Sequence, residues 1–287
     1  MFPIILVHGI ARFDVLTEWW KEEHGVQDGE LDQIHYFKNI KTFLEANGIG
    51  PVRHSTQSFA ASVEDRASEL ADFVRRTVDE IGSAKVHLIG HSMGGLDARH
   101  CIVDHGLDAV VASLTTIGTP HLGTQLADHA LDAGGYLWIK VAGSVLDLEG
   151  FADLTTTACD TFNQRAEPIE GENSVEYHAV AGAEAFERMF WPLAPSGRYL
   201  DRTSGPNDGL VPVSSQLWTA GLKRSDGTIK VVSQSTLPFP ADHLNEIGWW
   251  DASEEFNGTV DGEPRVGAAE YETMVKQFYL SIARNLE

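Results

Sequence analysis

The segment VHLIGHSMGGLDARH, residues 86–100, decides the fold. A continuous apolar run leads into GHSMG (90–94), and the residues that follow have helical spacing. In the pattern G-x-S-x-G a strand ends in a sharp turn that carries a serine, and a helix follows at once. Side chains two residues before and after the serine would collide in such a turn, which explains Gly90 and Gly94. The segment therefore predicts a nucleophile at Ser92; the alternative is a structural strand-to-helix turn that contains a serine.

Strand-like and helix-like segments alternate along the first half of the chain. Short apolar runs that end in glycine or proline predict buried strands, and apolar residues at helical spacing predict amphipathic helices. The expected strands are PIILVHG (3–9), VRHSTQSF (52–59), KVHLIGHS (85–92), VVASLTTIGTP (110–120) and EYHAVAGAE (176–184). The expected helices cover residues 36–48, 62–82, 93–106, 124–148 and 271–287. This order predicts the α/β class with a mostly parallel, doubly wound sheet.

Composition restricts the function classes. The chain has 287 residues and a formal net charge of −21, so phosphate backbones of nucleic acids would be repelled. No apolar run approaches the roughly 18 residues that span a bilayer, and a neutral substrate fits the charge best. There is no internal repeat or linker, so we expect a single domain over residues 1–287. The two cysteines allow at most one disulfide, and Cys101 is expected to be a buried thiol.

A serine nucleophile needs a base and an orienting acid, which in this fold class follow in the order Ser, Asp or Glu, His. Of the histidines after Ser92, only His243 in PFPADHLNEIG (238–248) lies on a loop beyond all the expected strands. We predict that it is the base; the alternative is a surface-loop histidine. Asp208 in GPNDGLVPVSS (205–215) is the expected acid, although Asn-Asp-Gly is also an ordinary turn.

The oxyanion of an ester intermediate needs two fixed N–H donors. The backbone N–H of Met93, immediately after the nucleophile, is the first expected donor. The second is expected from the loop after the first strand, where Gly9 permits close backbone approach and Ile10 supplies the N–H. His121 directly follows a strand end, so His121 and Leu122 are expected to line the substrate pocket.

Four parts of the sequence together resemble one family. PIILVHGI, VHLIGHSMGGLDAR, SLTTIGTPHLGT, and NDGLV followed by DHLNEIG are similar to segments of the bacterial true lipases of the α/β-hydrolase fold, which are typically secreted triacylglycerol lipases. The resemblance implies the same nucleophile, acid, base and oxyanion donors as the residues above. It also implies an apolar helical cap or lid over about residues 122–165. Leu126–Leu148 would be either a mobile lid helix or an ordinary cap helix.

The resemblance also raises the question of metals. Many relatives hold a structural calcium near the catalytic histidine; the corresponding candidates here are Asn245, which carries no charge, and Asp251. Asp65 matches a zinc ligand of the thermophilic branch, but the histidines that complete that site lie in an insertion absent here. We therefore predict that no cofactor is required, treat calcium as the weaker alternative, and place the chain between the mesophilic and thermophilic branches.

These observations predict a serine hydrolase of carboxylic esters, most simply a triacylglycerol lipase that acts as a monomer at a lipid–water interface. The alternatives are a short-chain carboxylesterase, a polyester hydrolase or an acyltransferase that uses the same triad. A non-catalytic relative that acts as a binding protein is an alternative from another class. The resemblance implies secretion, but no basic signal-peptide region precedes the first strand of this chain, so the compartment stays open.

Overall fold

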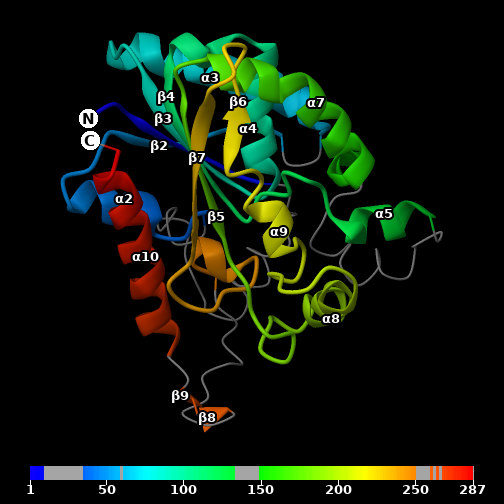
Figure 1. The fold of residues 1–287 in the computed structure, drawn as a ribbon. Coiled ribbons are helices and arrows are strands. Elements are labelled where there is room, and N and C mark those ends of the chain that lie inside the picture. The colour runs from blue at the N-terminus through cyan, green and yellow to red at the C-terminus, as the bar shows by residue number, and fades with distance from the viewer. Residues whose placement is uncertain are drawn as a thin grey trace.

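A seven-stranded sheet forms the centre of the protein (Figure 1). The computed structural model describes residues 1–9, 35–58, 61–132, 149–249, 259–260, 263–264 and 267–286. The strand order is β2-β1-β3-β4-β5-β7-β6, and every pairing is parallel except the one between β6 and β7. The strands are β1 (Ile4–Val7), β2 (Val52–His54), β3 (Val86–His91), β4 (Val111–Ile117), β5 (Glu176–Ala181), β6 (Gly221–Lys223) and β7 (Ile229–Thr236). A separate ribbon pairs β8 (Thr259–Val260) with β9 (Glu263–Pro264).

Helices cover both faces of the sheet, as Figure 1 shows for α2 and α10 on one side and α3, α4 and α7 on the other. The α-helices are α2 (Ile40–Ala46), α3 (Val63–Ile81), α4 (Met93–Asp104), α5 (Gln125–Asp132), α7 (Thr156–Glu172), α8 (Ala194–Thr203), α9 (Val213–Gln216) and α10 (Ala268–Arg284). Within the described residues, short 3-10 helices are η1 (Leu107–Ala109), η2 (Glu149–Leu154) and η3 (Asn245–Ile247). The predicted doubly wound α/β fold is therefore confirmed.

The alternation of side chains along β1 explains why both faces need helices. Ile4 and Leu6 belong to the core cluster on the side of α2 and α10, and Ile5 and Val7 belong to the cluster beneath α3 and α4. All four side chains are fully buried. Because successive residues of a strand point to opposite faces, an unbroken apolar run is stable only when both faces are covered.

A third apolar cluster lies beyond the start of α4. Met93 and Leu96 pack there with residues of α5, η2 and α8. The described parts of the expected cap, residues 122–132 and 149–165, contribute Leu126 and Phe151 to this cluster. Residues 133–148, which include most of the expected lid helix, lie outside the described residues.

Most expected elements are present, with differences at their ends. Ser62 caps α3 by accepting the N–H of Asp65 (3.2 Å), and Gly82 ends it with φ 67°, as expected. The strand expected over 52–59 stops at His54. The hairpin β6–β7 and the helices α7 and α8 were not expected. The predicted burial of the Cys101 thiol is confirmed, and Cys159 is buried as well.

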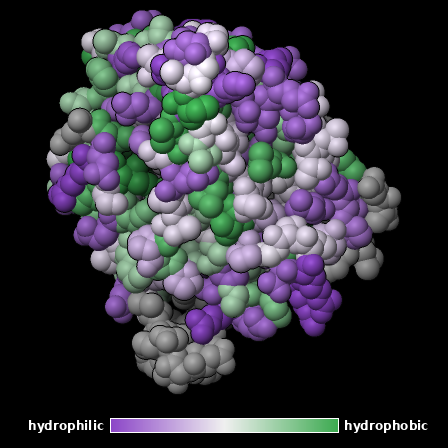
Figure 2. Space-filling model, in the orientation of Figure 1, coloured by the Kyte–Doolittle hydropathy of each residue, from purple (hydrophilic) through white to green (hydrophobic). Residues whose placement is uncertain are grey.

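The surface of the edge hairpin is mixed in character. Ile229 and Val231 of β7 are exposed, and Figure 2 shows hydrophobic residues in small separate groups among hydrophilic ones on this face. Among the residues that the structure describes, no helix is both long enough and apolar enough to cross a membrane.

Candidate active site

The turn between β3 and α4 has the geometry that the sequence predicts. Ser92 has φ 56° and ψ −135°, a backbone conformation that side-chain-bearing residues seldom adopt. A Cβ atom on Gly90 would lie 2.8 Å from the backbone of Gly95, and one on Gly94 would overlap the carbonyl oxygen of Val7. Only glycine therefore fits at the two flanking positions. The Ser92 side chain stands at the end of β3, where ligands bind in open α/β sheets.

Three predicted residues form one hydrogen-bonded line. Ser92 Oγ lies 2.8 Å from His243 Nε2, and His243 Nδ1 lies 2.8 Å from Asp208 Oδ2. His243 comes from the loop between β7 and η3, and Asp208 from the loop between α8 and α9. The His243 N–H also donates to the Asp208 carbonyl oxygen (2.8 Å), so the two loops are joined through both backbone and side chain. Such a line can move a proton from a hydroxyl to an imidazole that a carboxylate orients.

Backbone and side-chain donors hold the Asp208 carboxylate in place. Its Oδ1 accepts the N–H groups of Leu210 (2.8 Å) and Val211 (2.7 Å). Its Oδ2 accepts from Gln216 Nε2 (3.1 Å) besides contacting His243. The side chain is fully buried. These donors fix the Asp208 carboxylate in one orientation. The aspartate of an ordinary exposed Asn-Asp-Gly turn would not be held in this way.

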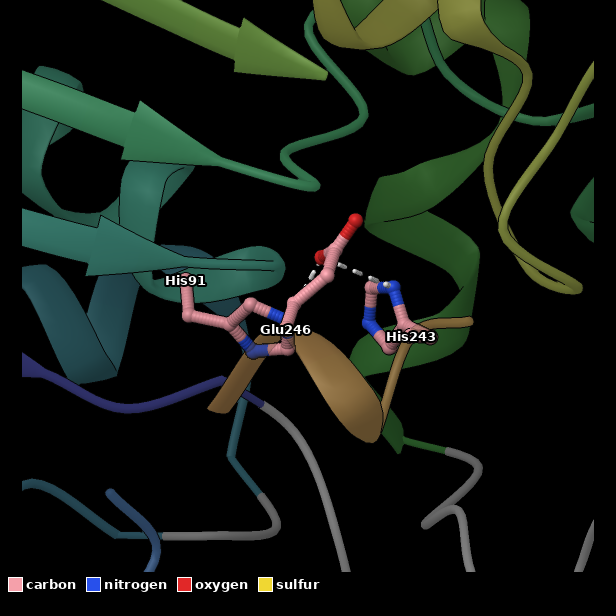
Figure 3. A group of neighbouring side chains, drawn as sticks. All are labelled: His91, His243 and Glu246. Atoms are coloured by element: carbon pink, nitrogen blue, oxygen red, sulfur yellow. Dashed lines mark hydrogen bonds and ion pairs between the residues drawn. The ribbon is translucent and has the colours of Figure 1, made fainter. Parts of the chain in front are cut away.

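A second carboxyl group, which the sequence reading missed, lies behind the base. Figure 3 shows Glu246 between the imidazole rings of His91 and His243, with its Oε2 3.0 Å from His91 Nε2 and 3.9 Å from His243 Nδ1. Burial, with the nearby carboxylates of Asp208 and Asp242, raises the pKa of Glu246 well above its usual value. Burial and the adjacent His243 lower the pKa of His91 well below its own. Both shifts disfavour a charged pair at the contact between Glu246 and His91.

The same three side chains, His91, His243 and Glu246, are the ones among the described residues whose ligand atoms could surround a metal ion. Their ligand atoms lie within 4.8 Å of one another. However, His243 Nδ1 already contacts Asp208, and His91 Nε2 already contacts Glu246. A metal here would have to break the line that leads to Ser92, and hydrogen bonding already accounts for the cluster.

The loop after β1 lies directly against Ser92. A Cβ atom on Gly9 would come within 2.7 Å of Ser92 Cβ, which confirms the expected close approach of this backbone. The preceding His8 is buried, and burial together with Arg66 lowers its pKa to about 3, so its ring is neutral. Ile10, the expected second oxyanion donor, lies outside the described residues. Met93, the other expected donor, is the first residue of α4, where N–H groups have no partner within the helix.

The structure corrects the expectation that His121 lines a substrate pocket. Its side chain is buried, with Nε2 2.8 Å from Thr116 Oγ1 and Nδ1 3.3 Å from the guanidinium of Arg99. Its ring stacks on Trp218 at 4.9 Å between centroids. A strand end does not by itself decide which way the next side chain turns, and here buried partners draw it into the core. Its neighbour Leu122 is 42% exposed.

The weak calcium candidate Asn245 is engaged within its own loop. Its Oδ1 accepts the N–H of Asp242 (3.3 Å), and its Nδ2 donates to the carbonyl oxygen of Trp249 (2.8 Å). Asp251, the other candidate, lies outside the described residues. Asn245 therefore acts as a structural brace for the turn that carries His243.

Comparisons with known proteins identify relatives of this chain. The model of the alpha/beta hydrolase fold family matches residues 42–163. Triacylglycerol lipase 2 of Saccharomyces cerevisiae is 28% identical over 321 residues, which cover 99% of this chain and 90% of that protein. A triacylglycerol lipase of Vibrio cholerae is 34% identical over 246 residues, or 75% of this chain and 73% of its own length. A lipase structure from Bacillus licheniformis superposes with a TM-score of 0.61 at 21% identity and 85% coverage of each chain, a likeness of fold.

Proposed function

The chain belongs to the lipases of the α/β-hydrolase fold and is a carboxylic ester hydrolase, and from this premise we propose that it cleaves triacylglycerols through Ser92, His243 and Asp208. The observation that carries the proposal is the line of two 2.8 Å contacts from Ser92 Oγ through His243 to Asp208. The strained backbone at Ser92 supports it, because such strain persists where function requires it.

The proposed reaction has two halves. His243 takes the hydroxyl proton of Ser92 as the oxygen attacks the ester carbonyl, and Asp208 stabilises the imidazolium that forms. The N–H groups of Met93 and Ile10 bind the oxyanion. His243 then gives its proton to the leaving alcohol, and an acyl-enzyme remains on Ser92. Water, deprotonated by His243, hydrolyses the acyl-enzyme and restores the starting state.

This chemistry needs no cofactor. Protons move between Ser92, His243 and the substrate, and backbone N–H groups supply the electrostatic stabilisation.

Exposed apolar side chains on the described surface favour a lipid ester over a small polar one. Leu122, Leu131 and Trp191 are large apolar side chains that are 42%, 56% and 68% exposed. Leu131 lies on α5 within the proposed cap, residues 122–165. The net charge of −21 favours an uncharged substrate surface, such as a drop of neutral lipid, over an anionic membrane. We propose that the protein acts there as a monomer.

The finer family placement remains part of this proposal. Resemblance to the bacterial true lipases, between their mesophilic and thermophilic branches, rests on the motifs around Ser92, Asp208 and His243. Asp65 takes part in the N-terminal cap of α3, where its Oδ2 accepts from Ser62 Oγ (2.9 Å), and this structural role accounts for its position without zinc.

A fluorophosphonate probe tests the nucleophile. The wild-type chain is expected to be labelled and to hydrolyse p-nitrophenyl esters, and Ser92→Ala is expected to lose both, with kcat lowered by at least about 10⁴-fold. Ser113→Ala is a matched control, since Ser113 is equally buried on β4 and far along the sheet from the turn. An unlabelled wild-type chain would identify a binding protein instead.

A chain-length profile tests the substrate class. Rates on p-nitrophenyl esters from two to sixteen carbons, and on emulsified triolein, are compared at equal protein concentration. A lipase gains rate with long acyl chains and above the solubility limit of the substrate. A maximum rate on short soluble esters would indicate a carboxylesterase. Activity on polyester film would indicate a polyester hydrolase. Transfer of the acyl group to an added alcohol in preference to water would indicate an acyltransferase.

A further inference from the structure

We propose that Gln216 is a positioning residue for Asp208: its side-chain amide joins the carboxylate oxygen that faces His243 to the backbone at the end of β5. The inference rests on the proposed function, because it concerns the same reaction. Gln216 is the last residue of α9, and its side chain is fully buried. Sequence patterns did not single it out, since its contacts form only when α9 meets the sheet.

The backbone of Gly182 fixes the direction in which the Gln216 amide points. The N–H of Gly182 donates to Gln216 Oε1 (2.7 Å), and Gln216 Nε2 donates to the Gly182 carbonyl oxygen (3.0 Å). A backbone N–H only donates and a carbonyl oxygen only accepts, so exchange of the amide oxygen and nitrogen would break both contacts. Gly182 directly follows β5, so the amide is anchored to the sheet.

The same amide nitrogen reaches the carboxylate. Gln216 Nε2 lies 3.1 Å from Asp208 Oδ2 and 2.8 Å from the carbonyl oxygen of Val211. The nitrogen has two hydrogens for three acceptors, so at least one hydrogen is shared. The Val211 carbonyl also accepts the N–H of Asp208 (3.3 Å) and therefore does not depend on Gln216 alone.

The other donors to Asp208 do not duplicate this contact. The N–H groups of Leu210 and Val211 bind the other carboxylate oxygen, Oδ1. Among the residues that the structure describes, the second group that contacts Oδ2 is His243 Nδ1, which Oδ2 itself has to orient. Without Gln216, the position of Oδ2 would depend on the imidazole ring whose orientation it is meant to set.

The amide also stabilises the negative charge that the reaction needs on Asp208. Burial, together with the nearby Asp208 charge, raises the pKa of Glu246 well above its usual value and that of Asp242 to about 6. Three carboxyl groups thus lie close together in the interior. A buried carboxylate keeps its charge when N–H groups donate to it. Gln216 supplies such a donor at the oxygen that faces the imidazolium formed in the reaction.

Loss of the amide is expected to lower kcat rather than substrate affinity. Gln216→Met keeps an unbranched side chain of similar length but has no N–H to donate. The imidazolium forms only as the reaction proceeds, so the contact is felt mainly in the transition state. We expect kcat per folded molecule on a p-nitrophenyl ester to fall by about 10–100-fold, with KM within about 3-fold of the wild type.

Asn173→Leu is the matched control, because it removes a buried amide at the opposite end of β5. Asn173 Oδ1 accepts the N–H of Val175 (3.1 Å), and Asn173 Nδ2 donates to Tyr177 Oη (2.9 Å). The control thus loses contacts to backbone and side chain as well, but none of them leads to Asp208. We expect its kcat per folded molecule to stay within about 2-fold. Urea denaturation gives the folded fraction of each variant.

A double-mutant cycle with Asp208→Asn shows whether Gln216 acts through the carboxylate. Asp208→Asn removes the charge that the amide stabilises. Addition of Gln216→Met to Asp208→Asn is therefore expected to change kcat by less than about 3-fold. A brace that acts independently of the carboxylate would instead lower kcat by about the same factor in both backgrounds.

Gln216→Glu keeps the test decisive if Gln216→Met does not fold. It preserves the side-chain volume and the acceptor for the Gly182 N–H. The second oxygen of the introduced carboxyl would face Asp208 Oδ2 and two carbonyl oxygens, so it favours the protonated form, which donates as the amide does. We expect kcat within about 5-fold of the wild type at pH 6, and a ratio to the wild type lower by a further factor of about 10 at pH 9 as this proton is lost.

An unchanged kcat in folded Gln216→Met would overturn the inference, and so would equal losses in the two backgrounds of the cycle. A ratio of Gln216→Glu to wild type that stays constant between pH 6 and pH 9 would overturn it as well. If the wild-type chain neither hydrolyses esters nor reacts with the fluorophosphonate probe, the proposed function fails instead.

Discussion

Two buried polar networks start from the same strand–turn–helix unit. One runs from Ser92 through His243 to Asp208, with Glu246 behind it. The other starts seven residues later, where Arg99 of α4 binds both carboxylate oxygens of Glu170 at 2.8 Å. Both contain a buried histidine and a buried carboxylate.

The networks differ in how completely they are satisfied. In the second, the remaining nitrogen of Arg99 donates to Asn163 Oδ1 (2.8 Å), and the guanidinium lies 3.9 Å from the centre of the Trp218 ring. In the first, Glu246 Oε1 is buried without a hydrogen-bond partner among the described residues. The backbone does not separate the two networks, because Ser92 in the first and Trp218 in the second both have φ 56°. The difference between these two networks is therefore the unpaired carboxyl oxygen, and not burial, charge or backbone strain.

The largest effect is expected in the first network. Asp208→Asn places an amide donor opposite His243 Nδ1 and favours the wrong imidazole tautomer. We expect kcat to fall by about 10³–10⁴-fold, equivalent to roughly 4–5.5 kcal/mol, while the protein stays folded. Asp201→Asn, on the exposed surface of α8, is the control in the same p-nitrophenyl ester assay. Activity of Asp208→Asn within about 10-fold of the wild type would show that another group orients His243.

A substitution in the second network is expected to lower stability and to leave kcat nearly unchanged. Glu170→Gln leaves the Arg99 charge buried without a counter-charge, which costs about 3–5 kcal/mol of unfolding free energy. We expect kcat per folded molecule to stay within about 3-fold. Urea denaturation and active-site titration measure the two quantities separately. Asp160→Asn, on the exposed face of the same helix α7, serves as control, and a kcat loss as large as that of Asp208→Asn would erase the contrast between the networks.

A tight fit around Glu246 gives a third, smaller effect. A Cβ atom on Gly182 would overlap Glu246 Oε1 and lie 2.9 Å from Leu237 Cδ1. Gly182→Ala is therefore expected to cost about 1–3 kcal/mol of unfolding free energy through overpacking. In a Glu246→Ala background the same change should cost less, because the carboxyl no longer occupies the space. Additive effects in this double-mutant cycle would mean that the Glu246 carboxyl does not occupy the space into which the Gly182→Ala methyl group projects.

The smallest effect concerns pH. Because burial and two nearby carboxylates raise the pKa of Glu246 in the folded state, the unfolded state releases this proton first as pH rises. The stability associated with the neutral carboxyl is thus present below the usual glutamate value of 4.5 and is lost as pH rises toward the folded-state value. Glu246→Gln removes this loss, so its stability relative to the wild type should increase between pH 4 and pH 8. A gain on the order of 1 kcal/mol corresponds to roughly 2–4 °C in Tm.

Glu272 provides a control with the opposite sign. Hydrogen bonds from Lys276 and Asn39 lower its pKa against the effect of burial, so its stabilising contribution is present above the usual value and lost at lower pH. Glu272→Gln should therefore lose stability relative to the wild type as pH rises from 4 to 8. Equal pH slopes for the two variants would contradict the raised pKa of Glu246.

Much of the hydrogen-bonded line of Ser92, His243 and Asp208 was predictable from local sequence patterns and from the order of the residues along the chain. Ser92 follows from a five-residue motif between a strand and a helix, and His243 and Asp208 follow from their places on late loops. Glu246 was not predictable in the same way, because its contact with His91 joins residues that are 155 positions apart in the chain. Glu246 does follow His243 at a spacing of three, which in the tight turn of η3 returns the side chain toward the histidine.

The missed elements have physical causes as well. Helix α7 begins at a recognisable cap, where Thr155 Oγ1 accepts the N–H of Ala158 (3.2 Å), but Pro168 lies inside it, where proline usually ends a helix. In the hairpin β6–β7 the apolar residues Ile229 and Val231 are exposed, so the order of apolar and polar residues in the sequence did not indicate which face is buried. The prediction that His121 lines the substrate pocket failed because no residue close to it in sequence indicates its contacts with Arg99 and Trp218.

The distribution of the site along the chain has a consequence for synthesis. The proposed nucleophile Ser92 and the proposed base His243 are 151 residues apart in sequence, and His243 comes later. At a synthesis rate of about 5–20 residues per second, roughly 8–30 s separate the appearance of Ser92 from that of His243. During this interval β1, β3 and β4 are available to pair while the serine has no base. The growing chain is thus able to pair these strands before the proposed catalytic line from Ser92 to His243 can form.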